Sequence, residues 1–227
     1  MAMVFVAGSV AQAAARAAEA FGAPIAFRRG PAGLLAERIR AGDRCDLYIS
    51  ASEAGPRSLS GFAPHHVIAH NRMVLLARPG IAAGSDALAL LADPRWRIGM
   101  STPGADPSGD YAAGFLDGMP GAVRSRCRSL FGGQLPDPAS TGSPALEVLR
   151  AGEADLLIIY ATSARRIAQS LPGVSILPLP APVTTICAAL SQDADPVARE
   201  FLAFLTGAEG QRILMQSGFL GIGSAGG

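Results

Sequence analysis

Small polar residues follow several apolar runs of this 227-residue chain, at points where a strand ends and a helix begins. Gly8 and Ser9 follow the run Met3–Ala7, and Ser108 and Gly109 precede a helical stretch. Hydroxyls and free backbone N–H groups at a helix N-terminus favour negative charge, because unpaired donors and the helix dipole act together there. The pattern therefore predicts an anion-binding site.

Catalytic chemistry has little support in the sequence. All 19 basic residues are arginine, so no lysine is available for a Schiff base or a phosphate-binding loop. The acidic residues are dispersed, and they form neither a Ser-His-Asp order nor a metalloprotease motif nor a carboxylate pair. We therefore expect a binding protein with no enzymatic activity and no cofactor.

The histidines and cysteines do not show metal-ligand spacing. His65, His66 and His70 are close in sequence, but no carboxylate or cysteine of ligand spacing joins them, so we expect a solvated loop. Cys45 and Cys187 lie in apolar runs that are typical of small buried thiols. The odd number of widely spaced cysteines argues against a disulfide framework, and no metal site is predicted.

The composition is that of a folded, lightly charged protein, with 49% hydrophobic and 16% charged residues and a formal net charge of +1. A nucleic-acid-binding face requires clustered basic residues, whereas the arginines here are scattered. A membrane span requires about 20 consecutive apolar residues, and no such run occurs. We expect neither a nucleic-acid partner nor insertion into a membrane.

Strand-like and helix-like patterns alternate along the chain. The predicted strands are Met3–Ala7, Ile25–Phe27, Cys45–Ser50, Arg72–Ala77, Arg97–Met100 and Asp155–Tyr160. The predicted helices are Val10–Phe21, a helix carrying Leu34, Leu35 and Ile39, Tyr111–Met119, Ala145–Arg150 and a pair within Pro196–Ser217. This alternation predicts an α/β fold with mainly parallel sheets, which bind ligands beyond the carboxyl ends of their strands.

Several segments are distinctive because of their order along nearly the whole chain. They are Val4–Ser9, Leu35–Ile39, Asp46–Ala51, Asn71–Pro79, Pro107–Ala112, Gly152–Tyr160 and Phe201–Phe219. In this order they resemble the molybdate-binding proteins of bacterial ABC importers, a branch of the type II periplasmic binding fold that includes binders of tungstate.

The resemblance implies two α/β lobes that close by a hinge around a ligand in the cleft between them. It assigns residues 1–78 and 183–227 to the first lobe and residues 79–182 to the second, with crossing strands near Ala77 and Val183. It also implies that neutral donors hold the oxyanion. Carried over position by position, these are the hydroxyls of Ser9, Ser108 and Tyr160 and the N–H groups of Ala32 and Gly142.

The chain departs from the family pattern beside the second strand. Gly30–Gly33 stands where the family commonly has serines, and Pro31 lacks even an N–H. Ser108 stands where the family usually has alanine, so a hydroxyl gained there compensates in part. Arg29, just before the altered loop, is an additional candidate for ligand contact.

The resemblance implies the substrate-binding component of an ABC importer, with permease subunits as transient partners. We expect a monomer in the periplasm, with its signal peptide removed, although a cytoplasmic protein is an alternative. Two other functions stay open: the same fold binding another oxyanion or a small organic acid, and a cytoplasmic ligand-sensing domain. Binding measurements with several anions, together with the neighbouring genes, distinguish these alternatives.

Overall fold

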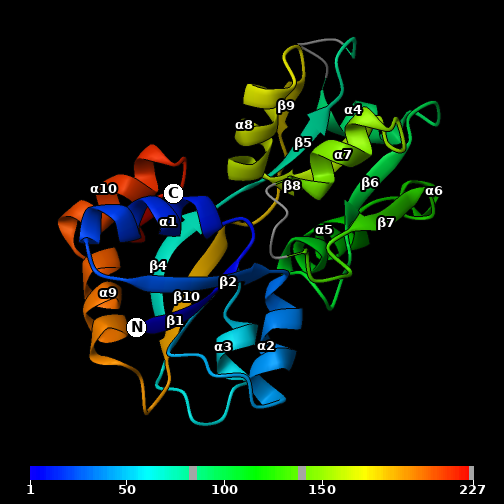
Figure 1. The fold of residues 1–227 in the computed structure, drawn as a ribbon. Helices are drawn as coiled ribbons and strands as arrows, with labels where there is room; N and C mark the ends of the chain where they lie inside the picture. Colours follow the sequence, from blue (N-terminus) through cyan, green and yellow to red (C-terminus); the bar gives the residue numbers. More distant parts are fainter. Residues whose placement is uncertain (82–85, 138–141, 225–227) are drawn as a thin grey trace. The chain divides into compact units, whose positions relative to one another are not determined.

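The computed structural model describes residues 1–81, 86–137 and 142–224, and Figure 1 shows their fold. The described residues divide into two compact units. The first unit contains those within Met1–Asn71, Leu135–Pro138 and Val183–Gly227, and the second those within Arg72–Gln134 and Ala139–Pro182. Each unit has one five-stranded sheet that is flanked by helices.

The elements of the first unit come from both ends of the chain. They are β1 (Ala2–Ala7), α1 (Ala11–Phe21), β2 (Ile25–Gly30), α2 (Ala32–Arg40), β3 (Leu47–Ser50), α3 (Ala54–Arg57), β4 (His66–Asn71), β10 (Thr184–Leu190), α9 (Pro196–Thr206), α10 (Ala208–Gln216) and the short 3-10 helix Ile222–Ser224. The elements of the second unit are β5 (Met73–Ala77), α4 (Ala87–Ala92), β6 (Ile98–Ser101), α5 (Pro107–Asp117), α6 (Gly121–Arg124), β7 (Cys127–Phe131), α7 (Pro144–Arg150), β8 (Leu156–Tyr160), α8 (Ala161–Ser170) and β9 (Ser175–Pro178).

The two sheets have the same design. The strand order is β2-β1-β3-β10-β4 in the first and β7-β6-β8-β5-β9 in the second. In each sheet four strands run in one direction, and one strand, β10 or β5, runs antiparallel to its neighbours. The predicted α/β fold with mainly parallel sheets is confirmed. Each antiparallel strand directly follows a point where the chain passes from one unit to the other.

Aromatic packing holds the helices of the first unit to its sheet. The Phe21 ring on α1 lies 5.5 Å from Phe201 and 5.5 Å from Phe204 on α9, and Phe27 on β2 meets Phe201 edge to face. Phe201 is fully buried. Aromatic pairs of this kind contribute about 0.5–1.5 kcal/mol each beyond their burial. They fix α1 and α9 against one face, while α2 and α3 cover the other (Figure 1).

The core of the second unit forms around β8, whose five residues are all buried. Leu157 and Ile159 belong to a core cluster with Leu146 on α7 and Ile167 on α8. A strand that is covered on both faces reads as a continuous apolar run, which is why its sequence predicted this strand well.

The pairing of β5 corrects the predicted lobe boundary. The family resemblance implied that residues 1–78 belong to the first lobe, but β5 (Met73–Ala77) pairs with β8 and β9 of the second sheet. The N-terminal segment of the first unit therefore ends at Asn71. The hydrogen bonds of β5 to β8 and β9 decide which unit this strand belongs to, and these bonds cannot be predicted from the local sequence.

The histidine segment is also corrected. The sequence predicted a solvated loop across His65, His66 and His70, whereas His66–Asn71 forms β4 and His70 is only 6% exposed. The polar side chains within this strand interrupt the apolar run that would have predicted it. The strand pairs with β10. Cys45 and Cys187 are buried free thiols, as expected.

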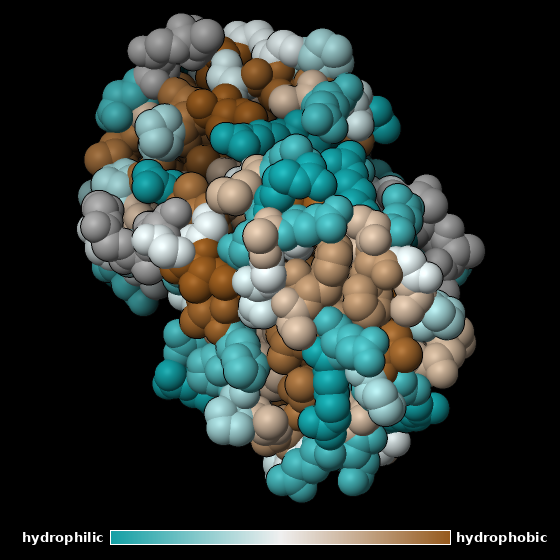
Figure 2. Space-filling model, turned by 90° about the vertical axis from the view of Figure 1, so that its left-hand side faces the viewer, coloured by the Kyte–Doolittle hydropathy of each residue, from teal (hydrophilic) through white to brown (hydrophobic). Residues whose placement is uncertain are grey.

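Hydrophilic and hydrophobic residues are interspersed on the face drawn in Figure 2. Within the described part of the chain, no helix combines the length and the apolar character needed to cross a bilayer.

Candidate anion-binding site

The carboxyl ends of β1 and β2 lie side by side in the first unit. Ala7, the last residue of β1, pairs with Gly30, the last residue of β2. The backbone N–H of Gly8 then donates to the carbonyl of Gly30 at 3.0 Å. This bond ties the two strand ends together, so the segments that follow them, at Ser9 and at Pro31, emerge at the same edge of the sheet.

Ser9 lies in the turn between β1 and α1 and is half-buried. The helix begins at Ala11, with Val10 at the N-cap position, one residue later than the sequence predicted. Ser9 is therefore not the helix cap. Its hydroxyl makes no hydrogen bond with any other described residue, so it is available to a ligand at this edge.

Ala32 is the first residue of α2 and is 1% exposed. The N-cap residue is Pro31, which has no side-chain acceptor for the free N–H groups of the first turn. The carbonyl of Ala32 accepts a hydrogen bond of 2.6 Å from the Tyr48 hydroxyl. That bond fixes the start of the helix, while its first N–H groups keep the anion-binding character of an uncapped helix N-terminus.

Arg29 is the penultimate residue of β2 and lies beside Val6. Adjacent residues of a strand point to opposite faces of the sheet. Arg28 uses its face to pair with Asp43 and to lie over the ring of Phe5. The guanidinium of Arg29 makes no ion pair or hydrogen bond with another described residue, so its charge is not compensated within this part of the structure.

Leu135 and Pro136, from the middle of the sequence, cover the end of β2. The sequence did not predict this contact. A Cβ at Gly30 would lie 2.7 Å from Leu135 and 3.6 Å from Pro136. Glycine is needed here for the close approach of these side chains. The predicted division had placed Leu135 and Pro136 in the second lobe, but they group with the first unit.

Ser108 and Tyr160 lie at one edge of the second sheet. Tyr160 ends β8, and α5 follows β6, which is the parallel neighbour of β8. Tyr160 is 2% exposed, and its ring meets Tyr111 of α5 edge to face at 6.4 Å. Ser108 is 5% exposed, and its hydroxyl makes no hydrogen bond with another described residue.

Asp106 is an additional residue at this edge and was not among the predicted site residues. It caps α5, so this helix begins at Pro107 and not at the predicted Tyr111. Its carboxylate accepts from the N–H of Ser108 at 3.2 Å and from the hydroxyl of Ser101 at 2.6 Å. Aspartate followed by proline is a recognised helix start, so this signal was present in the sequence.

The surroundings of Tyr160 keep its hydroxyl protonated. Burial raises the pKa of the Tyr160 hydroxyl well above its usual value, and Asp106, Tyr111 and Asp110 raise it further. Burial also raises the pKa of Asp106, although its hydrogen bond from Ser101 opposes this shift. Tyr160 is consequently a neutral hydrogen-bond donor at physiological pH.

Gly142 is exposed and lies just before Ser143, which caps α7 by accepting from the N–H of Leu146. Residues 138–141, which precede Gly142, lie outside the described residues, so only the residues that follow Gly142 are described.

The structure brings Ser9, Arg29 and Ala32 to one edge of the first sheet, and it brings Ser108 and Tyr160 to one edge of the second.

Sequence comparison identifies the family. Residues 2–220 match the model of the bacterial extracellular solute-binding proteins. The chain belongs to this family. An uncharacterized protein of Pasteurella multocida is 34% identical over 164 residues, which span 66% of this chain and 68% of that protein.

Solved structures of solute-binding proteins share the fold. The periplasmic molybdate-binding protein of Azotobacter vinelandii is 21% identical, with a TM-score of 0.75 over 97% of this chain and 99% of that one. The sulfate-binding protein SubI of Mycobacterium tuberculosis is 16% identical, with a TM-score of 0.76 over 99% of this chain and 88% of that one. These likenesses confirm the predicted architecture of a solute-binding protein.

Proposed function

We propose that this solute-binding protein is the substrate-binding component of an ABC importer and captures a tetrahedral oxyanion, molybdate or tungstate, without catalysing a reaction. The observation that carries the proposal is the edge formed by the ends of β1 and β2. There the Ser9 hydroxyl and the first N–H groups of α2 lie on adjoining segments, and neither has a side-chain acceptor among the described residues.

Neutral donors suit an oxyanion that has lost its hydration shell. Each hydrogen bond to a charged group contributes about 1.5–3 kcal/mol, so a buried dianion needs several of them. In the proposal Ser9 and Ala32 donate from the first unit, and Ser108, Tyr160 and Gly142 donate from the second. Hinge closure then joins the two sets, and the closed form is presented to the permease from the periplasm as a monomer.

Asp106 and Arg29 have opposite effects on an anion. The Asp106 carboxylate accepts from the N–H of Ser108 and so removes one helix donor from the second unit. Its charge also disfavours a dianion nearby. The uncompensated guanidinium of Arg29 offsets this effect, and we infer that Arg29 contributes to the ligand site.

A small organic acid is a second candidate, because of Arg29 and the loop that follows it. A free guanidinium can bind a carboxylate through two parallel hydrogen bonds, which a compact oxyanion does not require. Pro31 also supplies no N–H to an oxyanion cage. These two residues are the specific features that favour a carboxylate.

Isothermal titration with molybdate, tungstate, sulfate, phosphate and a small dicarboxylate tests both candidates. The proposal predicts one site per chain, with molybdate and tungstate bound more tightly than sulfate and phosphate. Ser9→Ala should weaken molybdate binding about tenfold to a hundredfold, since it removes one bond to a charged ligand. Ser125→Ala, at an exposed serine after α6, is the matched control and should bind normally.

No heat from any of the four oxyanions would refute the oxyanion proposal. Binding of the dicarboxylate that is lost in Arg29→Gln would support the second candidate. The neighbouring genes test the transport role: a permease and an ATPase gene support it, whereas an adjacent winged-helix segment supports a cytoplasmic sensing domain.

A further inference from the structure

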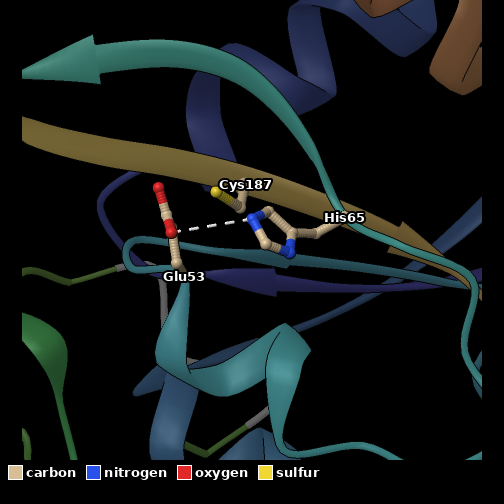
Figure 3. Close-up of side chains that lie close together, drawn as sticks. All are labelled: Glu53, His65 and Cys187. Carbon is tan, nitrogen blue, oxygen red and sulfur yellow. Dashed lines mark ion pairs between the residues drawn. The ribbon is translucent and has the colours of Figure 1, made fainter.

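Three side chains with metal-binding atoms converge in the first unit. Glu53 precedes α3, His65 precedes β4, and Cys187 lies within β10. Their ligand atoms all lie within 4.8 Å of one another. Figure 3 shows the Glu53 carboxylate and the His65 ring pointing toward one another beside the Cys187 sulfur.

Strand pairing creates this cluster. Cys187 pairs with Ser50 at the end of β3 and with Val67 near the start of β4. The residues just after β3 and just before β4 are thereby brought to the same place beside β10. The spacing of residues along the chain does not reveal this cluster, because Glu53 and Cys187 reach His65 only through this pairing.

We propose that Glu53, His65 and Cys187, none of which is a proposed oxyanion donor, form a binding site for Zn²⁺. A thiolate, an imidazole and a carboxylate are ligands that zinc prefers in proteins. The His65 Nε2 and Glu53 Oε2 atoms lie 3.7 Å apart. Two such ligands around one tetrahedral zinc lie about 3.3–3.5 Å apart, so the histidine and the carboxylate need to approach each other by only a few tenths of an ångström. The Cys187 sulfur lies within 4.8 Å of both atoms, so it needs to move by at most about 1 Å.

The site has an entry path and a place for a fourth ligand. Cys187 is fully buried, whereas the side chains of His65 and Glu53 are 18% and 37% exposed. A cation can therefore approach from the side of the histidine and the carboxylate, and a water molecule completes the tetrahedron. Three protein ligands with one open position are a common zinc arrangement.

Proton balance sets the chemistry of binding. The S–H bond of Cys187 breaks, a sulfur–zinc bond forms, and the proton leaves to solvent. Burial raises the pKa of this thiol to about 12, and the nearby Glu53 charge contributes to the rise. The thiol is therefore protonated without a cation, and the zinc charge is what stabilises the thiolate.

Arg57 competes with the cation for Glu53. Its guanidinium lies 2.5 Å from Glu53 Oε2 in an ion pair one helical turn away. The same oxygen faces His65 Nε2 at 3.7 Å, so the guanidinium and a zinc ion would compete for it. Removing the arginine charge should therefore strengthen zinc binding.

Cobalt spectroscopy on the reduced, chelator-treated protein tests the site, with Co²⁺ and then Zn²⁺ as the probes. The proposal predicts one Co²⁺ per chain, a thiolate-to-cobalt charge-transfer band, and displacement of cobalt by zinc. Cys187→Ser should abolish the band and His65→Ala should weaken zinc binding at least tenfold, whereas Arg57→Gln should tighten it. Cys45→Ser and His66→Ala are matched controls that should retain both the band and the affinity.

Far-UV circular dichroism verifies that each variant is folded, and a Zn²⁺-dependent rise in the melting temperature of the parent provides a second readout. The absence of a thiolate band in the folded parent would overturn the proposal. A band that persists in Cys187→Ser or disappears in Cys45→Ser would overturn it as well. None of these measurements involves an oxyanion, so they are independent of the proposed transport function.

Discussion

Replacing Gly109 with alanine should destabilise the second unit and displace the start of α5. A Cβ at this position would lie 2.5 Å from the Thr102 carbonyl carbon, 2.6 Å from the Pro103 nitrogen and 2.6 Å from the Ser101 oxygen. All three are backbone atoms, which cannot rotate away as a side chain can. The helix must instead move by roughly 1 Å to restore ordinary van der Waals contact.

The expected loss follows from two opposing effects. Overpacking a buried position costs about 1–3 kcal/mol, and contact with backbone atoms places this case at the upper end. Alanine is favoured over glycine within a helix by up to about 1 kcal/mol. The free energy of unfolding of Gly109→Ala should therefore fall by about 2 kcal/mol. Since the same shift moves Ser108 and Asp106, oxyanion affinity should also fall.

Gly114 provides the matched control, because it lies in the same helix and is exposed. A Cβ there meets no atom within 4 Å. Gly114→Ala should therefore stabilise the unit by about 0.5–1 kcal/mol. The protein has one tryptophan, Trp96, which lies in the second unit, so its fluorescence during urea unfolding reports on this unit specifically. Equal urea midpoints for the two variants would refute this reasoning.

Two further predictions concern carboxylates of the second unit. Asp106→Asn keeps a helix-capping side chain but removes the carboxyl group, whose pKa is raised by burial. A raised pKa means that the buried carboxylate charge destabilises the folded state at neutral pH, so the variant should have a higher urea midpoint there. This gain should vanish below pH ~4, where the unfolded carboxyl is protonated as well; a gain that persists in acid would contradict the charge argument. Asp155→Asn should lower the free energy of unfolding by about 1.5–3 kcal/mol, since Asp155 accepts hydrogen bonds from Arg97 and Arg78. Arg97 holds the pKa of Asp155 well below its usual range, so this stabilisation is present above pH ~4 and is lost as the pH falls further. A difference between the parent and Asp155→Asn that is the same at pH 7 and in strong acid would show that the ion pair does not act in this way.

The sequence predicted the elements whose residues are uniformly apolar. β1 and β8 were found because fully covered strands read as continuous apolar runs. β4 was missed because His66, His70 and Asn71 interrupt that pattern. β5 was recognised as a strand but assigned to the wrong lobe, because its hydrogen bonds to β8 and β9 are not visible in local sequence.

The candidate site was predictable where it depends on strand ends. The pairing of Ala7 with Gly30 places the segments carrying Ser9 and Ala32 together, as expected for parallel neighbours. Asp106 was a missed helix-cap signal. The approach of Leu135 to Gly30, and of Cys187 to His65, depends on long-range packing that residue spacing does not encode.

A crystal structure of the protein with tungstate tests the central claim most directly, because the heavy atom locates the anion by its anomalous scattering. The proposal predicts one anion that accepts hydrogen bonds from the Ser9 hydroxyl and the Ala32 N–H, and also from Ser108 or Tyr160. An anion bound to surface arginines of one unit alone, or no anion at saturating tungstate, would contradict it.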